Sequence, residues 1–232
     1  MYKNMMKKLN FNMEEIKLFD SFAGIGALHQ SLKELGVPIK LTGISEVDID
    51  AIISYASIHI DNFKDITFDY PSDDEMRKVL MDRNIGYDFK KNKSKIPRLN
   101  KNKLKSCFKA TMLLNNLGDI GKLDCDNIPD FDLFNFSFPC QNISIAGKQE
   151  GMKKEDGSIT KSGTALKLEQ NYRLRRLTPT ECWRLMGFRD EHINKAIELG
   201  ISDSQLYKQA GNSIVVNVLY FIFKNLFRDY IK

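Results

Sequence analysis

The sequence has few cysteines and lacks the spacings that disulfide frameworks and zinc sites need. The four are far apart in the 232-residue chain: Cys107, Cys125, Cys140 and Cys182. Scattered, reduced cysteines are typical of proteins that stay inside the cell, and one of them could be a nucleophile. We therefore expect free thiols and no metal site.

Long apolar runs are also missing. No run reaches the roughly 18 residues that a membrane-spanning helix needs. The N-terminal segment Met1–Lys8 is basic but has neither the apolar stretch nor the cleavage site of a signal peptide. With 42% hydrophobic residues, the composition is ordinary for a globular protein. We expect a cytoplasmic protein with no membrane partner.

Acidic residues are absent from Lys90 to Lys109, where eight Lys and one Arg occur. The whole chain has a net charge of +5, which is compatible with a polyanionic partner. Basic runs are common both in solvated loops and on surfaces that contact phosphates, so both interpretations stay open. This run belongs to a long polar stretch, residues 62–117, in which we predict one helix (73–84) and which we interpret as an insertion.

The N-terminal pattern predicts a strand–helix–strand unit and hence an α/β fold. Residues 16–20 form a strand, 27–36 a helix that ends at Gly36, and 41–46 a second strand. The turn between strand and helix contains Gly24 and Gly26, which let the backbone approach an adenosine-containing cofactor. Glu46, 20 residues beyond Gly26, can accept hydrogen bonds from ribose hydroxyls. The alternative for Glu46 is an exposed carboxylate at a strand end.

A second apolar segment starts at Asp130 and ends abruptly in Pro139-Cys140-Gln141. Its length predicts a buried strand, and a small, polar loop follows. Cys140 would then lie at the carboxyl end of a strand, where open α/β sheets bind ligands. The alternative is an inert core cysteine, because lone cysteines among aromatics are usually buried.

The C-terminal third predicts helices. Residues 178–186 carry a capping box and a proline at the first helical position. Residues 190–199 form another helix, and 213–231 read as a buried helix. Asn212 and Ser213 precede this last helix, and they either cap it or form a turn that closes a ligand pocket.

Taken together, these features resemble the C5-cytosine DNA methyltransferase family of bacterial and phage restriction-modification systems. Six of its motifs occur in order: Asp20–Gly26 (first), Ile44–Glu46 (second), Gly118–Ile120 (third), Ser137–Gly147 (fourth), Arg176–Phe188 (ninth) and Tyr207–Val218 (tenth). The resemblance implies a Rossmann-like, S-adenosylmethionine-dependent methyltransferase fold of class α/β. It implies one catalytic-type domain over residues 1–232, with a truncated sheet.

The resemblance also implies a mechanism on double-stranded DNA. A cytosine is flipped out of the duplex, the Cys140 thiolate attacks C6, and C5 takes the methyl group of S-adenosylmethionine. Pro139 would fix the loop, and Gln141 would hydrogen-bond phosphate or backbone. Phe22 would lie against the adenine, Asp119 would contact its amino group, and Asn212 would help close the pocket. The implied cofactor-binding residues are Phe22, Ala23, Gly24, Gly26, Glu46, Asp119, Ile120, Asn212 and Ser213.

Three parts of the family pattern are missing: the Glu-Asn-Val strand whose Glu contacts cytosine N3, the Gln-x-Arg strand, and the target-recognition domain. Only 25 residues separate Gly147 from Arg173, and the apparent deletion lies near residues 166–172. Without the acid at N3, the attack on C6 loses a factor of roughly 10²–10⁴. The sheet would end at the strand before Cys140, with an apolar edge exposed.

We therefore expect a weak or inactive enzyme unless a partner, either a second polypeptide or another copy, completes it. Two alternatives stay open. One is a non-catalytic remnant that binds S-adenosylmethionine or DNA. The other is a transfer-RNA methyltransferase of the same fold, which the form Phe138–Gln141 disfavours.

Overall fold

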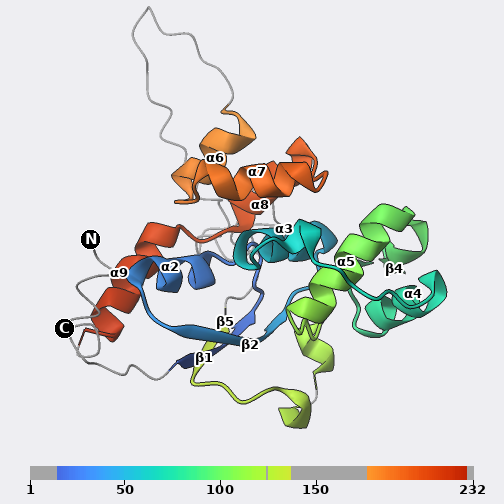
Figure 1. Cartoon of the computed structure of the whole chain (residues 1–232), viewed down its shortest axis with the longest axis horizontal. Coiled ribbons are helices and arrows are strands. Elements are labelled where there is room, and N and C mark those ends of the chain that lie inside the picture. The colour runs from blue at the N-terminus through green and yellow to red at the C-terminus, as the bar shows by residue number, and fades with distance from the viewer. Residues whose placement is uncertain (1–14, 124, 137–176, 229–232) are drawn as a thin grey trace, which may run out of the picture. The chain divides into compact units, whose positions relative to one another are not determined.

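A three-stranded parallel sheet lies at the centre of the computed structural model (Figure 1). The middle strand β1 (Ile16–Ser21) pairs with β2 (Ile39–Ser45) on one side and with β5 (Leu133–Phe136) on the other. Among the described residues β5 has no further neighbour, so the sheet ends at the strand that leads to Cys140. The mixed α/β class and the short sheet confirm the predicted fold class.

The structure describes residues 15–123, 125–136 and 177–228. The chain divides into two compact units, one of Met1–Phe136 with Thr178–Lys232 and the other of Ser137–Leu177. All described residues except Leu177 belong to the first unit. The catalytic loop predicted at Ser137–Gly147, and the junction predicted near 166–172, lie outside the described residues.

Helix α2 (Ala27–Leu35) follows β1 as predicted. A glycine in the left-handed conformation lies at each end of the helix, Gly26 before it and Gly36 after it. The N–H of Gly36 donates to carbonyls of the last turn. Its buried face includes Leu28 and Leu32, and it packs against the C-terminal helix α9 (Val216–Leu226). The tenth motif therefore returns to the first helix, although their sequences are almost 200 residues apart.

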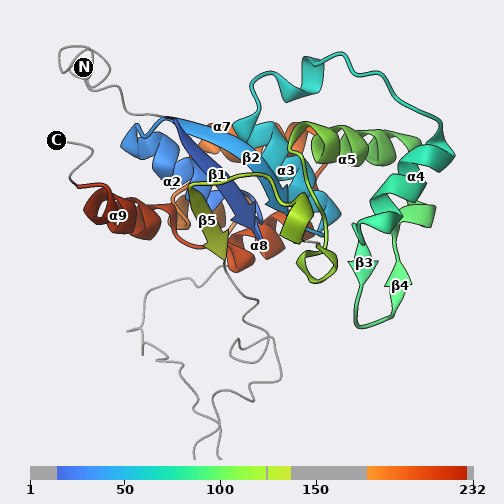
Figure 2. The same cartoon turned by 90° about the horizontal axis from the view of Figure 1, so that it is seen from below.

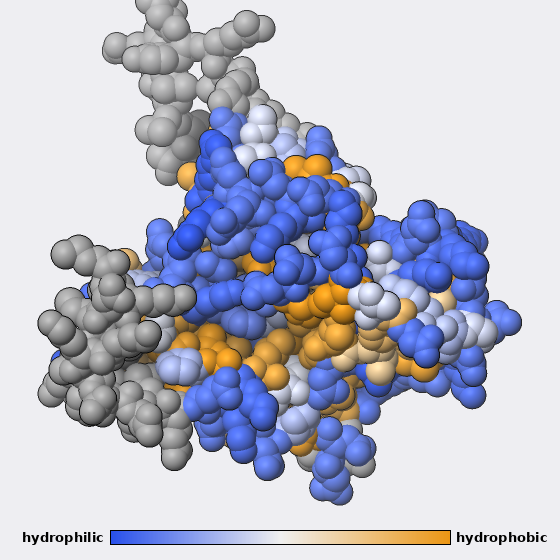
Figure 3. All heavy atoms as spheres, in the orientation of Figure 1, coloured by the Kyte–Doolittle hydropathy of each residue, from blue (hydrophilic) through white to orange (hydrophobic). Residues whose placement is uncertain are grey.

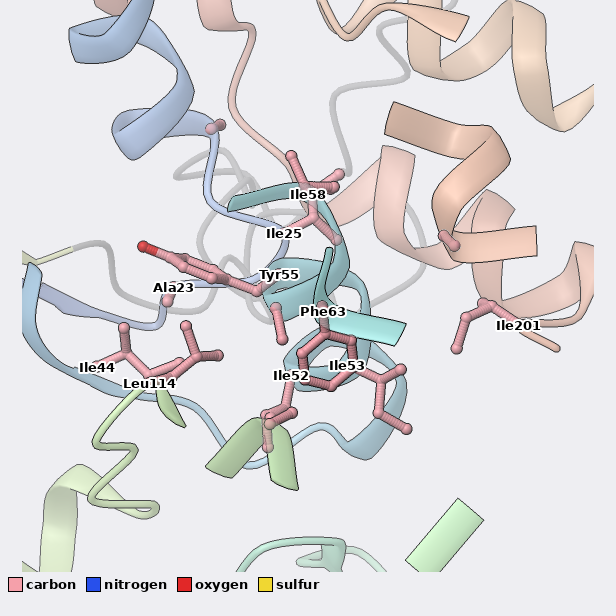
Figure 4. Packing of buried hydrophobic residues seen from close by; sticks show 14 of the residues in the cluster. Ala23, Ile25, Ile44, Ile52, Ile53, Tyr55, Ile58, Phe63, Leu114 and Ile201 are labelled. Carbon is pink, nitrogen blue, oxygen red and sulfur yellow. The ribbon is translucent and has the colours of Figure 1, made fainter. Parts of the chain in front are cut away.

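Helix α3 (Ile49–His59) forms the middle of the hydrophobic core. The Asp48 carboxylate caps it by accepting hydrogen bonds from the N–H groups of residues 50 and 51. Ile52, Ile53 and Tyr55 are fully buried and lie together in Figure 4. A helix that is buried nearly all round needs covering elements on several sides.

Residues 62–117 supply one of these covers, and they contain more structure than we predicted. Helix α4 (Asp73–Asp82) was predicted, but a second helix, α5 (Lys101–Leu113), was not. Between them lie a two-stranded antiparallel hairpin, β3 (Tyr87–Asp88) and β4 (Lys93–Ser94), and the 3-10 turn η2 (Ile96–Arg98). Three further 3-10 turns among the described residues are η1 (Phe63–Asp65), η3 (Ile120–Lys122) and η4 (Cys125–Asn127). The basic run is thus not one solvated loop, because α5 buries an apolar face against α3.

The C-terminal segment contains four helices, α6 (Pro179–Leu185), α7 (Asp190–Glu198), α8 (Asp203–Asn212) and α9. The predicted capping box of Thr178 and Glu181 is present at α6. Of the two alternatives for Asn212 and Ser213, capping of the last helix is ruled out: Asn212 is the last residue of α8, and α9 begins after Val215 with no side-chain cap. The interruption is therefore only the short link 213–215.

Two segments that we predicted to be buried, the strand before Cys140 and the last helix, have exposed apolar side chains. For the strand, an exposed apolar edge was also expected. Phe134 and Phe136 of β5 are 41% and 55% exposed, and Phe221 and Ile222 of α9 are exposed too. In Figure 2 the described helices α2, α3, α7 and α8 lie behind the sheet. Parallel sheets are normally covered on both faces, so this sheet has a face and an edge that the described residues leave open.

Candidate functional site

The turn after β1 holds three residues with positive φ: Phe22 (51°), Gly24 (54°) and Gly26 (79°). A Cβ added to Gly24 would meet only one backbone oxygen, at 4.0 Å, so this glycine faces open space. A Cβ at Gly26 would lie 2.3 Å from His59 Nε2. Gly26 is thus required by packing beneath the turn, whereas Gly24 leaves room above it for a ligand. Ala23 between them is buried.

Glu46 follows β2 directly and closes onto this turn. Its Oε2 accepts a hydrogen bond from the Gly24 N–H over 2.9 Å. Its Oε1 accepts from the N–H groups of Val47 and Asp48, over 2.8 and 2.9 Å. Burial raises the pKa of Glu46, and the hydrogen bonds from backbone N–H groups oppose that rise. The carboxylate is therefore a fixed acceptor at the carboxyl edge of the sheet rather than a solvated strand end.

Asn116, which sequence reasoning missed, holds Glu46 in place. Its side chain is fully buried; the amide N–H donates to the Glu46 carbonyl over 3.0 Å. Its Oδ1 accepts from the backbone N–H groups of Glu46 (3.1 Å) and Gly118 (3.0 Å). One amide thus joins the second motif to the third. The signal available in the sequence was an Asn two residues before the Gly-Asp-Ile string.

Asp119 lies on this same edge, through the Gly118 link. Its Oδ2 accepts from the Asn84 amide over 2.8 Å, and its Oδ1 accepts from the Gly121 N–H over 3.0 Å. Ser45 donates to the Gly118 carbonyl over 2.7 Å, which fixes this turn to the end of β2. Ile120 is partly buried at the start of η3. The structure therefore brings the second and third motifs together despite the 73 residues between them.

Beneath the turn lies a buried polar cluster of Asp20, His29, Tyr55 and His59, which we did not predict. His29 Nδ1 lies 3.0 Å from the Tyr55 hydroxyl, and the His29 and His59 rings stack at 4.2 Å. His59 Nε2 lies 3.2 Å from the Ile25 carbonyl. Since a carbonyl only accepts, neutral His59 carries its proton on Nε2, which ties helix α3 to the turn.

This cluster perturbs the protonation of its members. Burial raises the pKa of Asp20 to about 7, against the lowering effect of the hydrogen bond from the Asn135 amide. Burial lowers the pKa of His29 to about 4 and holds that of His59 well below its ordinary value. Asp20 Oδ2 and His59 Nδ1 have no hydrogen-bond partner within the described part of the chain. Uncharged forms are therefore favoured beneath the turn.

Helix α8 contacts α3 and the N-terminal cap of α3 through Lys208 and Gln209, which precede Asn212 in the chain. Lys208 forms an ion pair with Asp48, and the Gln209 amide donates to Ser54 Oγ over 3.0 Å. Asn212 is exposed, and the one side-chain hydrogen bond of Ser213 goes to the adjacent carbonyl. No hydrogen bond among the described residues joins either of them to the turn at 22–26. Their role in closing the pocket therefore stays a prediction.

The predicted catalytic residues Pro139, Cys140 and Gln141 lie outside the described residues. Burial raises the pKa of the Cys107 thiol to about 12, so that group is unsuited to nucleophilic attack. In the three described ranges, no group of His, Cys, Asp and Glu side chains could hold a metal ion. None of the helices described is both long and apolar enough to span a bilayer.

The sequence model of the family described as C-5 cytosine-specific DNA methylase matches residues 84–166 and 158–228. Among curated proteins, Type II methyltransferase M2.ScrFI of Lactococcus lactis subsp. cremoris is 38% identical over 144 residues, covering 62% of this chain and 40% of the relative. Orphan methyltransferase M.SssI of Spiroplasma monobiae is 30% identical over 171 residues, covering 71% of this chain and 44% of the relative. Orphan methyltransferase M.Rho11sI of Bacillus phage rho11s is 54% identical over 74 residues, covering 32% of this chain and 15% of the relative. The chain therefore spans less than half the length of these relatives.

Proposed function

The chain belongs to the C-5 cytosine-specific DNA methylase family, and from that premise we propose that it binds S-adenosylmethionine at the Gly24–Glu46 edge of its sheet. One observation carries the proposal: the Glu46 carboxylate is fixed beside the open backbone of Gly24 by a 2.9 Å hydrogen bond. This is the arrangement in which an acidic residue after the second strand accepts from ribose hydroxyls.

The residues fit the chemistry of this cofactor. Among the described residues Glu46 Oε2 has one hydrogen-bond partner, the Gly24 N–H, and keeps a lone pair for a hydroxyl donor. Phe22 is partly exposed and offers a ring face to an adenine, while Asp119 lies on the same edge to accept from the adenine amino group. When bound, S-adenosylmethionine supplies a methyl group activated by a sulfonium. In this proposal Ala23, Ile120, Asn212 and Ser213 complete the pocket.

The proposed reaction is methylation of cytosine at C5 in double-stranded DNA. The Cys140 thiolate adds to C6 of a flipped cytosine, which makes C5 nucleophilic. Pro139 restricts the loop, and Gln141 contacts phosphate or loop backbone. C5 would then take the methyl group as the bond from that group to the sulfonium sulfur breaks. A base removes the C5 proton, and the Cys140 thiolate leaves. Cys140 suits this role better than Cys107, whose thiol stays protonated at neutral pH.

We further propose that residues 1–232 form one catalytic-type domain with an insertion at 62–117 and an internal deletion near 166–172. The family model supports the deletion, since it matches in two segments that meet at residues 158–166. A recognition domain and the strands with Glu-Asn-Val and Gln-x-Arg are absent from the sequence. The activity is therefore weak or absent until a complementing polypeptide or a second copy supplies the remainder. Among the described residues no strand pairs with the outer edge of β5, and this supports such a partner.

Titration calorimetry with S-adenosylhomocysteine tests the cofactor site. We expect micromolar affinity for the protein, loss of binding in Glu46→Ala, and unchanged binding in the control Glu198→Ala, whose side chain is exposed on α7. No binding to a folded sample would favour a non-catalytic remnant. Light scattering at micromolar concentration tests the second copy, and a monodisperse monomer would exclude it.

Methyl transfer tests the reaction class. The chain is mixed with a polypeptide that carries the part of M2.ScrFI that this chain does not match, and labelled methyl groups are counted in duplex DNA and in tRNA. Incorporation into DNA that depends on Cys140 supports the proposal. Incorporation into tRNA alone would favour the transfer-RNA enzyme.

A further inference from the structure

The basic residues after Asp88 fall into two groups. The side chains of some make ion pairs, hydrogen bonds or cation–π contacts within the fold, and those of the others make none with the described residues. Nine basic residues and no acidic ones lie between Asp88 and Asp119. Three, all on α5, have partners: Lys103 pairs with Asp50, Lys105 lies over the Tyr70 ring, and buried Lys109 donates to backbone carbonyls. These contacts give the three α5 lysines a structural role. The other six basic residues have no such role among the described residues.

The other six side chains are exposed and make no ion pair or side-chain hydrogen bond with any described residue. They follow one another along the β3–β4 hairpin, the turn η2 and the first residue of α5: Lys90, Lys91, Lys93, Lys95, Arg98 and Lys101. In Figure 3 the outer rim of the lobe that carries α4 and β4 is hydrophilic. A run of unpaired cations on one projecting element attracts polyanions.

The hairpin presents these cations on an ordered scaffold. Asp88 Oδ1 accepts from the backbone N–H groups of Lys90 and Lys91, both over 3.2 Å, and this fixes the turn. Phe89 is 60% exposed although it lies between charged residues, and its ring meets Tyr87 edge to face at 5.1 Å. An exposed aromatic side chain among lysines is the combination that contacts sugars and bases beside phosphates.

The root of the hairpin lies at the edge of the sheet that holds Glu46. The Gly86 N–H donates over 2.7 Å to the carbonyl of Val47, the residue that follows Glu46 in the chain. The Gly86 carbonyl then accepts from the Lys95 N–H over 2.9 Å, which closes the hairpin. A Cβ at Gly86 would lie 2.6 Å from Ile49 Cδ1, so the root packs tightly against α3. The hairpin is therefore anchored to the residue that follows Glu46 of the proposed cofactor site.

We propose that the β3–β4 hairpin is an arm that grips duplex DNA through its phosphates, next to the catalytic edge. This inference rests on the proposed function, because a DNA methylase must hold its duplex over that edge. The lysines neutralise phosphates without regard to sequence, and Phe89 packs against a deoxyribose or base. Such an arm supplies affinity to a chain that lacks a recognition domain.

Fluorescence anisotropy with a labelled 30-base-pair duplex tests the arm on the full chain. The arm variant replaces three hairpin lysines by glutamine: Lys90, Lys91 and Lys93. The control variant makes the same change of charge at three exposed lysines elsewhere: Lys17, Lys40 and Lys224. We expect the arm variant to bind about 100-fold more weakly at 0.1 M salt and to lower the slope of log K against log salt by about 2–3. The control should change affinity by less than about threefold.

Phe89→Ala gives a second, uncharged test. We expect about tenfold weaker binding with an unchanged salt slope, since stacking and packing do not release counterions. Equal losses in the arm and control variants would overturn the proposal, as would tighter binding of RNA than of the duplex. So would a wild-type protein that binds S-adenosylhomocysteine but no duplex at about 100 µM, the weak end of the range for non-specific binding. Loss of S-adenosylhomocysteine binding would instead refute the proposed function.

Discussion

The carboxylate of Glu46 accepts a hydrogen bond over 2.9 Å from the backbone N–H of Gly24, which lies 22 residues earlier in the chain. The same carboxylate also accepts from Val47 and Asp48, so one side chain sets the conformation of two loops. A change at Glu46 therefore alters both stability and the candidate site.

Glu46→Ala should lower the free energy of unfolding by roughly 2–4 kcal/mol, because three backbone N–H groups lose their acceptor. Glu46→Gln keeps one acceptor oxygen and should lose about half as much. Urea unfolding monitored by circular dichroism measures both variants. An unchanged midpoint in Glu46→Ala would mean that water replaces the carboxylate at no cost, and the three hydrogen bonds would then not hold the loops.

Asn116→Ala should be more harmful than Asn115→Ala. Asn116 makes three hydrogen bonds to backbone atoms of Glu46 and Gly118, and its site is fully buried. The Asn115 amide makes one, to the Thr42 carbonyl at an exposed position. We expect losses of about 3 and about 1 kcal/mol respectively in urea unfolding. Affinity for S-adenosylhomocysteine should fall at least tenfold in Asn116→Ala and stay unchanged in Asn115→Ala. Equal losses of affinity in the two variants would refute the role of Asn116 in joining Glu46 to Gly118.

Gly26→Ala should destabilise the protein by about 3 kcal/mol, because the new Cβ would collide with His59 while φ stays at 79°. Gly36→Ala is a matched control, since φ is 77° there and nothing lies within 4 Å. That variant should lose only about 1 kcal/mol, the cost of the strained backbone. In a His59→Ala background the effect of Gly26→Ala should shrink by about 1–2 kcal/mol. Strict additivity of the two changes would contradict the clash.

Asp20 should make the protein less stable as pH rises. Burial raises its pKa from 3.8 to about 7, so the folded state keeps a proton that the unfolded chain releases. The stability that this proton provides is fully present below about pH 4 and is lost as pH rises to about 7. A shift of 3 pKa units corresponds to about 4 kcal/mol.

Asp20→Asn isolates this contribution, because asparagine stays neutral and its Oδ1 can still accept from Asn135. Urea unfolding of both proteins at pH 5 and pH 8 should show that Asp20→Asn gains about 2–3 kcal/mol relative to wild type between these values. His29, whose pKa is lowered to about 4, has the opposite pH dependence but is present in both proteins and cancels. An equal difference at both pH values would mean that Asp20 ionises normally.

Local patterns predicted the elements well. The strand at 16–20, the helix that ends at Gly36 and the capping box of Thr178 and Glu181 are all confirmed. Each depends on residues within a few positions of one another, so their spacing is sufficient. Helix α5 was missed because its apolar positions are diluted by lysines, three of which are held by distant partners such as Asp50.

Short motifs with local chemistry were enough to predict the family, the α/β class and the residues expected at the site. The contacts that hold those residues in place are visible only in the folded structure, because they join residues far apart in the chain. Asn116 reaches Glu46 across 70 residues, His59 makes Gly26 obligatory, and the basic hairpin is rooted at Val47. Contacts of this kind are made when buried polar groups must find partners, and no local spacing encodes which distant group will lie within reach.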